Sequence, residues 1–115
     1  MATNVPLHRT EVITFNAIEG FHFWKDAPAA VGFLKDNHRH MFHVRCFFEV
    51  NDLDREVEII LMQREVESYL HGTYGKPCQF GGMSCEMIAE ELLVALKASC
   101  VEVLEDGEGG AIVRE

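Results

Sequence analysis

The stretch HRHMFHVRCFFEV, residues 38–50, carries the strongest fold signal in this chain. Its even-numbered positions hold two histidines followed by apolar side chains: His38, His40, Phe42, Val44, Cys46, Phe48 and Val50. Its odd-numbered positions are mostly polar. Because the side chains of a β-strand point alternately to its two faces, the pattern predicts a strand whose apolar face begins with two histidines.

Weaker patterns on either side predict the neighbours of this strand. Alternation over residues 11–15 indicates a first strand. Residues 51–54, NDLD, are typical of a turn, and the pattern of residues 57–61, VEIIL, favours a further strand behind it. We therefore expect residues 57–61 to form a hairpin with the strand at 38–50.

The second half of the chain predicts two helices and then a hairpin. A short helix is expected at residues 63–70, and the glycine-rich stretch 71–82 is expected to be a loop. Ser84 is a good N-cap for a second helix with an apolar stripe. Strands are expected at 100–104 and 111–113. The order predicts an α+β fold in which two antiparallel β-hairpins form one sheet, with two helices inserted between them on one face.

Size and charge narrow the classes of function. With 115 residues, 48% of them hydrophobic, we expect a single domain over residues 1–115, with residues 1–10 as a loose leader. The net charge of −9 disfavours binding to nucleic acid or to an anionic membrane surface. No apolar run approaches the ~20 residues of a membrane helix, and the first residues lack a signal-peptide pattern. A soluble, cytoplasmic protein is expected.

The pair His38 and His40 is the strongest candidate for chemistry. Two histidines separated by one residue on a strand point the same way, so their imidazoles can share one metal ion. A third histidine would complete the protein ligand set of a catalytic zinc site. The candidates are His8, His22, His43 and His71. His43 falls on the opposite strand face, so His22 is favoured; the alternative is a histidine pair at the rim of the sheet without a ligand.

Three features occur in order along the chain. The first is His22 followed by the H-x-H of residues 38–40. The second is the polar helix start MSCEMIA at residues 83–89, and the third is VLEDG at 103–107, followed by IVR at 112–114. Together they resemble the 6-pyruvoyl-tetrahydropterin synthase and 6-carboxytetrahydropterin synthase family, over almost the whole chain. The resemblance implies the tunnelling fold, an α+β subunit with this order of elements.

The resemblance also implies a site and an activity. By position, His22, His38 and His40 would bind Zn²⁺, Glu105 would anchor a pterin or purine-like ring, and His71 would act as a general acid/base. A homo-oligomer, commonly a hexamer, with active sites between subunits is implied as well. The expected function is that of a zinc-dependent, lyase-like protein acting on a pterin or related GTP-derived heterocycle.

The chain departs from that family in its proton-transfer residues. Family members carry a cysteine shortly before the H-x-H, where this chain has FLKDN at residues 33–37, and Leu70 replaces the acid before the loop histidine. Asp36 is a candidate to replace the cysteine as a base, and Cys78, within the expected loop, is a weaker candidate for a thiol near the site. We expect the cysteine-dependent proton transfer to be lost or replaced. Two other classes stay open: a catalytically silent zinc- and pterin-binding oligomer, and a cupin-like metal enzyme, which also uses H-x-H.

Other features of the sequence predict ordinary structural roles. The cysteines form no CxxC pair, so reduced thiols in or near the core are expected: Cys46, Cys78, Cys85 and Cys100. The aromatic run FHFW at residues 21–24 is expected to lie in the core or in a subunit contact, and the alternative is a stacking platform for a ligand. The carboxylates of residues 56–67 are expected to form a solvated face.

Overall fold

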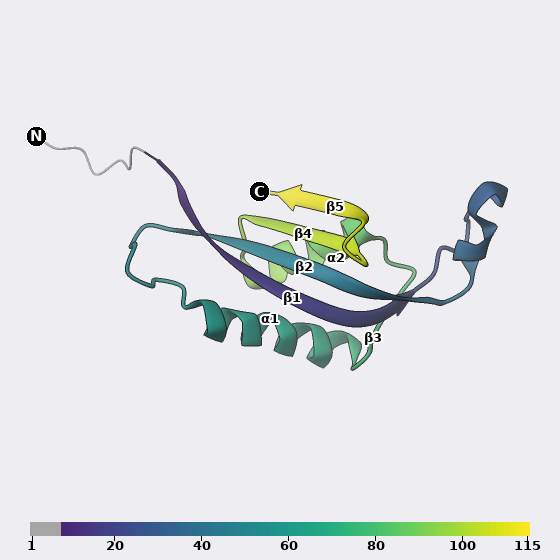
Figure 1. Cartoon of the computed structure of the whole chain (residues 1–115), viewed down its shortest axis with the longest axis horizontal. Helices are drawn as coiled ribbons and strands as arrows, with labels where there is room; N and C mark the ends of the chain where they lie inside the picture. The colour runs from purple at the N-terminus through teal and green to yellow at the C-terminus, as the bar shows by residue number, and fades with distance from the viewer. Residues whose placement is uncertain (1–7) are drawn as a thin grey trace, which may run out of the picture.

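The computed structural model describes residues 8–115, which form an α+β fold around one five-stranded mixed sheet (Figure 1). The strands lie in the order β3-β1-β2-β4-β5. Their bounds are β1 Thr10–His22, β2 His38–Val50, β3 Cys78–Gly81, β4 Cys100–Glu105 and β5 Gly109–Arg114. The helical segments are the 3-10 helix η1 Ala29–Lys35 and the α-helices α1 Ile59–Tyr74 and α2 Cys85–Leu96. Of the expected leader, residues 1–7 lie outside the described residues, and β1 already begins at Thr10.

β1 and β2 form a long antiparallel hairpin, paired from Thr10 opposite Val50 to His22 opposite His38. β2 has the bounds that the sequence predicts. β1 extends well beyond the predicted 11–15. The prediction was too short because several residues on the buried side of the strand are polar or glycine and break the apolar alternation. They are Thr14, Asn16 and Gly20.

The strand expected at residues 57–61 is wrong, since α1 begins at Ile59 and the hairpin partner of β2 is β1. Glu58 caps α1 by accepting hydrogen bonds from two backbone N–H groups of the first turn. The apolar side chains of that turn are more than half exposed, whereas Val66 and Leu70 are buried at a spacing of four residues. The helical spacing of buried side chains therefore begins only after residues 57–61, where the sequence pattern resembles a strand.

The stretch 71–82 is not one loop, which corrects the expectation from its glycines. α1 continues to Tyr74, and β3 pairs in parallel with β1, with Cys78 opposite Gly20. β3 has only four residues, and its partner lies far away in the sequence. Such a strand leaves no periodic signal of its own in the local sequence.

The second helix and the closing hairpin are confirmed. Ser84 caps α2 by accepting a hydrogen bond from the backbone N–H of Met87. β4 and β5 pair antiparallel, and β4 also pairs with β2, so the two hairpins join into one sheet. The sequence missed β3 and η1, and it paired β2 with the wrong segment.

α1 and α2 pack into one core with the inward face of the sheet. The core contains Val66 and Leu70 of α1, Ile88 and Leu92 of α2, and every second residue of β2 from Phe42. The two histidines that begin β2 continue this inward face beyond the core. All four cysteines are buried free thiols, as expected. Within the described residues, no helix is long and apolar enough to cross a membrane.

Candidate metal centre

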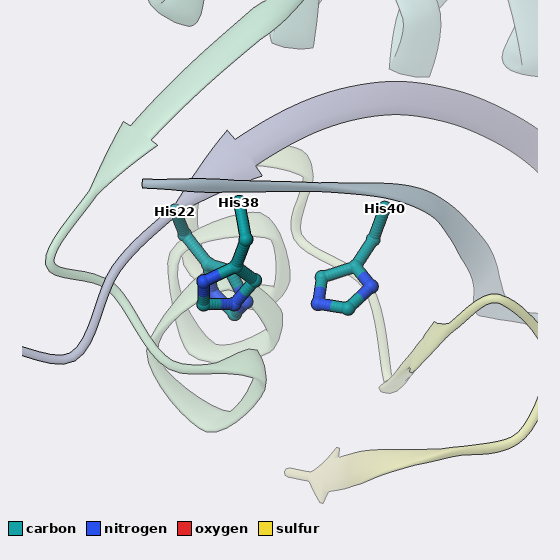
Figure 2. A group of neighbouring side chains, drawn as sticks. All are labelled: His22, His38 and His40. Atoms are coloured by element: carbon teal, nitrogen blue, oxygen red, sulfur yellow. The ribbon is translucent and has the colours of Figure 1, made fainter. Parts of the chain in front are cut away.

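Three histidines meet where β1 ends and β2 begins (Figure 2). His22 is the last residue of β1 and lies directly opposite His38, the first residue of β2. His40 follows two positions later on the same face of β2. One possible ligand atom from each imidazole lies within 4.8 Å of those from the other two. The structure thus brings together the three predicted ligands in a group that can hold a metal ion.

Each of these imidazoles is oriented by an oxygen acceptor at its Nδ1. The pairs are His22 with the Met83 carbonyl at 2.9 Å, His38 with the Asp36 carbonyl at 2.8 Å, and His40 with the Asp106 carboxylate at 2.7 Å. Because these oxygens accept hydrogen bonds, each Nδ1 carries a proton and each Nε2 of a neutral ring presents a lone pair. A hydrogen bond from the outer nitrogen to an oxygen is the usual support of a metal-binding histidine.

Two of the three Nε2 atoms lack a hydrogen-bond partner within the described residues. The Nε2 atoms of His22 and His40 are buried, and neither has a hydrogen-bond partner in residues 8–115. Leaving a buried polar atom unpaired costs roughly 1–3 kcal/mol, so such atoms call for an explanation. Burial is the main cause that lowers the pKa of His22 below its ordinary value, although the Met83 carbonyl and Glu105 act in the opposite direction. His22 therefore keeps a free lone pair at neutral pH, which fits a metal ligand.

A carboxylate faces the same point. Glu105 is the last residue of β4, and its Oε2 lies 3.1 Å from Nε2 of His22. Its Oε1 lies 3.4 Å from Nε2 of His40. The Cys85 thiol, at the start of α2, donates a hydrogen bond to Oε2 of Glu105 at 3.5 Å. Burial raises the pKa of Cys85 to about 12, so the sulfur stays protonated and acts as a donor.

Sequence reasoning missed Cys85 and Asp106 as members of the site. Asp106 has a left-handed backbone with a φ of 54°, and its Oδ1 accepts the backbone N–H of Met41 at 2.9 Å while Oδ2 contacts His40. The Met41 N–H is the main cause that lowers the pKa of Asp106, and His40 adds to it. The local signals were slight: Asp106 follows Glu105 in a turn, and Cys85 follows a capping serine.

The histidines line a cavity of about 510 Å³. This volume falls within the range of small-molecule sites, roughly 300–1,000 Å³. Glu105 and Cys85 lie in the same wall, next to apolar side chains. Among these are Phe23, Trp24, Leu34, Met83 and Met87. Phe23 and Trp24, expected in the core or in a subunit contact, are thus cavity residues, 37% and 49% exposed.

The other predicted site residues lie elsewhere. His71 is on α1 rather than in a loop, and it does not line the cavity. Asp36 is exposed and reaches the site only through its backbone carbonyl. Cys78 is buried outside the cavity, and burial raises the pKa of its thiol to about 11. His43 lies on the opposite face, as predicted, with its ring against Phe15 and away from the cavity.

Models of known protein families and curated proteins were compared with the chain, and none of them matches it. The histidines, the carboxylates and the cavity are therefore the features that bear on function.

Proposed function

We propose that this chain binds zinc through His22, His38 and His40 and acts on a pterin or related GTP-derived heterocycle in the adjoining cavity. The metal proposal rests on the arrangement of the imidazoles: each is paired at Nδ1 with an oxygen, and one ligand atom of each lies within 4.8 Å of those of the other two. Three imidazoles are the protein ligands of one common type of catalytic zinc site. Bound zinc would polarise an oxygen of the ligand as a Lewis acid.

The choice of heterocycle is supported by the resemblance in sequence and by the lining of the cavity. Phe23 and Trp24 offer aromatic surface to a flat ring. Glu105 has two oxygens at the cavity wall, which can accept two N–H groups of a guanidine-like ring edge. The order of the elements, with two hairpins and two α-helices between them, supports the proposal of a tunnelling fold.

A catalytically silent binding protein is the second candidate, and one observation favours it. Within residues 8–115 of one subunit, the cavity contains no group suited to the usual thiol-based proton transfer. Cys85 is protonated, and neither His71 nor the Asp36 side chain lines the cavity. A cupin-like enzyme is disfavoured, because the described strands form one mixed sheet rather than a two-sheet jelly roll.

We further propose a cytoplasmic homo-oligomer, hexameric by resemblance, with the site lying between subunits. The outward face of the sheet supports association. Ile13 and Phe15 of β1 are 48% and 46% exposed, and Ile112 of β5 is 43% exposed. Exposed apolar side chains on a sheet face favour packing against another protein, and here they lie on both sides of the ion pair between Arg45 and Glu102.

Elemental analysis of the purified protein tests the metal proposal. We expect close to one zinc per chain in the wild type and almost none in the variant His38→Ala, His40→Ala. His43→Ala is the matched control, because it removes a histidine from the opposite face of the same strand. A wild type that neither contains zinc nor retains added zinc would overturn the proposal.

Ligand binding then separates the two candidates. We expect the zinc-loaded protein to bind a dihydropterin, and Glu105→Ala to weaken that binding. Turnover of the dihydropterin supports the enzyme, whereas binding without turnover by the intact oligomer supports the silent protein. Failure to bind any pterin would contradict both.

A further inference from the structure

Four groups that carry lone pairs lie together in the metal centre. Three are the imidazoles, whose ligand atoms lie within 4.8 Å of one another, and the fourth is the carboxylate of Glu105, beside Nε2 of His22 and of His40. The Glu105 oxygens lie close to the Nε2 atoms of His22 and His40, yet those nitrogens make no hydrogen bond within the described chain, so the carboxylate faces unpaired nitrogen atoms. A carboxylate that faces imidazole lone pairs is unfavourable unless a positive charge, a proton or a metal ion, lies between them.

The spacing of these groups fits a shared ion. In a tetrahedral zinc site with bonds of about 2.0–2.2 Å, neighbouring ligand atoms are roughly 3.3–3.6 Å apart. The two Glu105 oxygens lie 3.1 Å from His22 Nε2 and 3.4 Å from His40 Nε2, close to that spacing. The histidine atoms lie within 4.8 Å of one another, so the imidazoles would close in by up to about 1.5 Å to bind one ion.

The carboxylate is itself oriented in the way that metal ligands are. Cys85 donates to Oε2 of Glu105, just as oxygen acceptors orient the three imidazoles. All four groups therefore have a supporting partner, and such partners are typical of metal sites. The Glu105 side chain is one-third exposed at the end of β4, which leaves it room to move into the cavity.

We propose that Glu105 is the fourth ligand of the metal ion while the cavity is empty, and that a cavity ligand reaches the ion only by displacing it. The proposal rests on the proposed function, because it requires the three histidines to bind a metal. It adds that Glu105 cannot complete the metal shell and anchor a ring at the same time. The carboxylate then moves from the ion to the ring when a heterocycle binds.

Cobalt substitution tests this assignment on the full chain. Chelator-treated wild type, Glu105→Gln and Glu108→Gln are loaded with Co²⁺, and sodium azide is titrated while the visible absorption spectrum is recorded. Glu108 is the matched control, since it lines the same cavity but makes no contact with the imidazoles. We expect azide to change the spectrum of Glu105→Gln, whose fourth position is open, and to leave the wild type and Glu108→Gln unchanged.

The affinity for Co²⁺ gives a second readout. We expect Glu105→Gln to bind Co²⁺ at least roughly tenfold more weakly than the wild type, as is typical when a metal site loses a supporting group. Circular dichroism first establishes that the variant is folded, and Glu105→Asp, which keeps the carboxylate, should recover part of the affinity. If wild type and Glu105→Gln respond to azide alike and bind Co²⁺ equally, the fourth-ligand role is overturned and the histidine site stands. If the wild type binds no Co²⁺ or Zn²⁺, the proposed function falls as well.

Discussion

At the scale of single residues, the metal centre depends on atoms outside the three histidines. Asp106 supports His40 through its side chain, whereas Asp36 supports His38 through its backbone carbonyl. Asp106 also accepts the N–H of Met41, so its carboxylate is held by two hydrogen bonds. Substituting the side chains of these two aspartates should therefore have different effects, although both residues lie beside the site.

We predict that Asp106→Asn lowers the affinity for zinc by roughly 10- to 100-fold, the usual cost of losing an outer-shell partner of a metal ligand. The charged acceptor at His40 Nδ1 is lost, so the ring is less well oriented and less basic. Asp36→Asn should leave the affinity unchanged, since the backbone carbonyl remains. Competition with a chromophoric chelator measures both constants, and equal affinities for the two variants would contradict a positioning role for Asp106.

At the scale of elements, the parallel strand β3 packs closely against β1 at a glycine. A Cβ atom added at Gly20 would lie 2.7 Å from Cε2 of Phe80 and 3.1 Å from Cδ2 of Phe42. Both phenylalanines are buried, so neither ring can move aside freely. Because Gly20 has no side chain, β3 can lie close to β1. The chain that continues from β3 to Met83, beside His22, is positioned by the same contact.

We predict that Gly20→Ala lowers the free energy of unfolding by about 1–3 kcal/mol, because the added methyl overpacks this contact. Gly72→Ala is the control: Gly72 lies in α1, and a Cβ there has no neighbour within 4 Å. That substitution should stabilise the protein by about 0.5–1 kcal/mol through helix propensity. Urea unfolding followed by circular dichroism measures both, and a Gly20→Ala variant as stable as the wild type would contradict the close packing.

At the scale of the whole molecule, the two faces of the sheet differ. The inward face is covered by α1 and α2, whereas the outward face holds exposed apolar side chains from β1 and β5. Phe15 lies on this outward face, opposite Arg45 in the β1–β2 register. A carboxylate at position 15 would face a cation within the same chain, so one subunit should tolerate it.

We predict that the wild type elutes as an oligomer of the 13.0-kDa chain and that Phe15→Glu shifts it toward smaller species, because charges are then buried between subunits. Phe33→Glu is the control, since Phe33 is 72% exposed on η1, away from the sheet face. Light scattering coupled to size-exclusion chromatography gives the masses. A monomeric wild type, or equal loss of assembly in both variants, would contradict association through this face.

Elements with a local signal could be predicted from the sequence alone. β2 followed from alternation, α2 from a capping serine and its apolar stripe, and the histidine group from H-x-H on an apolar strand face together with His22. Each of these signals lies within a few neighbouring residues, and strand geometry then decides where the side chains point.

The remaining features could not be predicted, because they depend on contacts between segments that are distant in the sequence. β3 exists through its pairing with β1, and the first turn of α1 alternates like a strand although Glu58 caps a helix there. Cys85 and Asp106 join the site only because α2 and the turn after β4 lie beside the imidazoles. The same packing turns the Glu105 carboxylate toward the histidine nitrogens, a placement that no local period encodes.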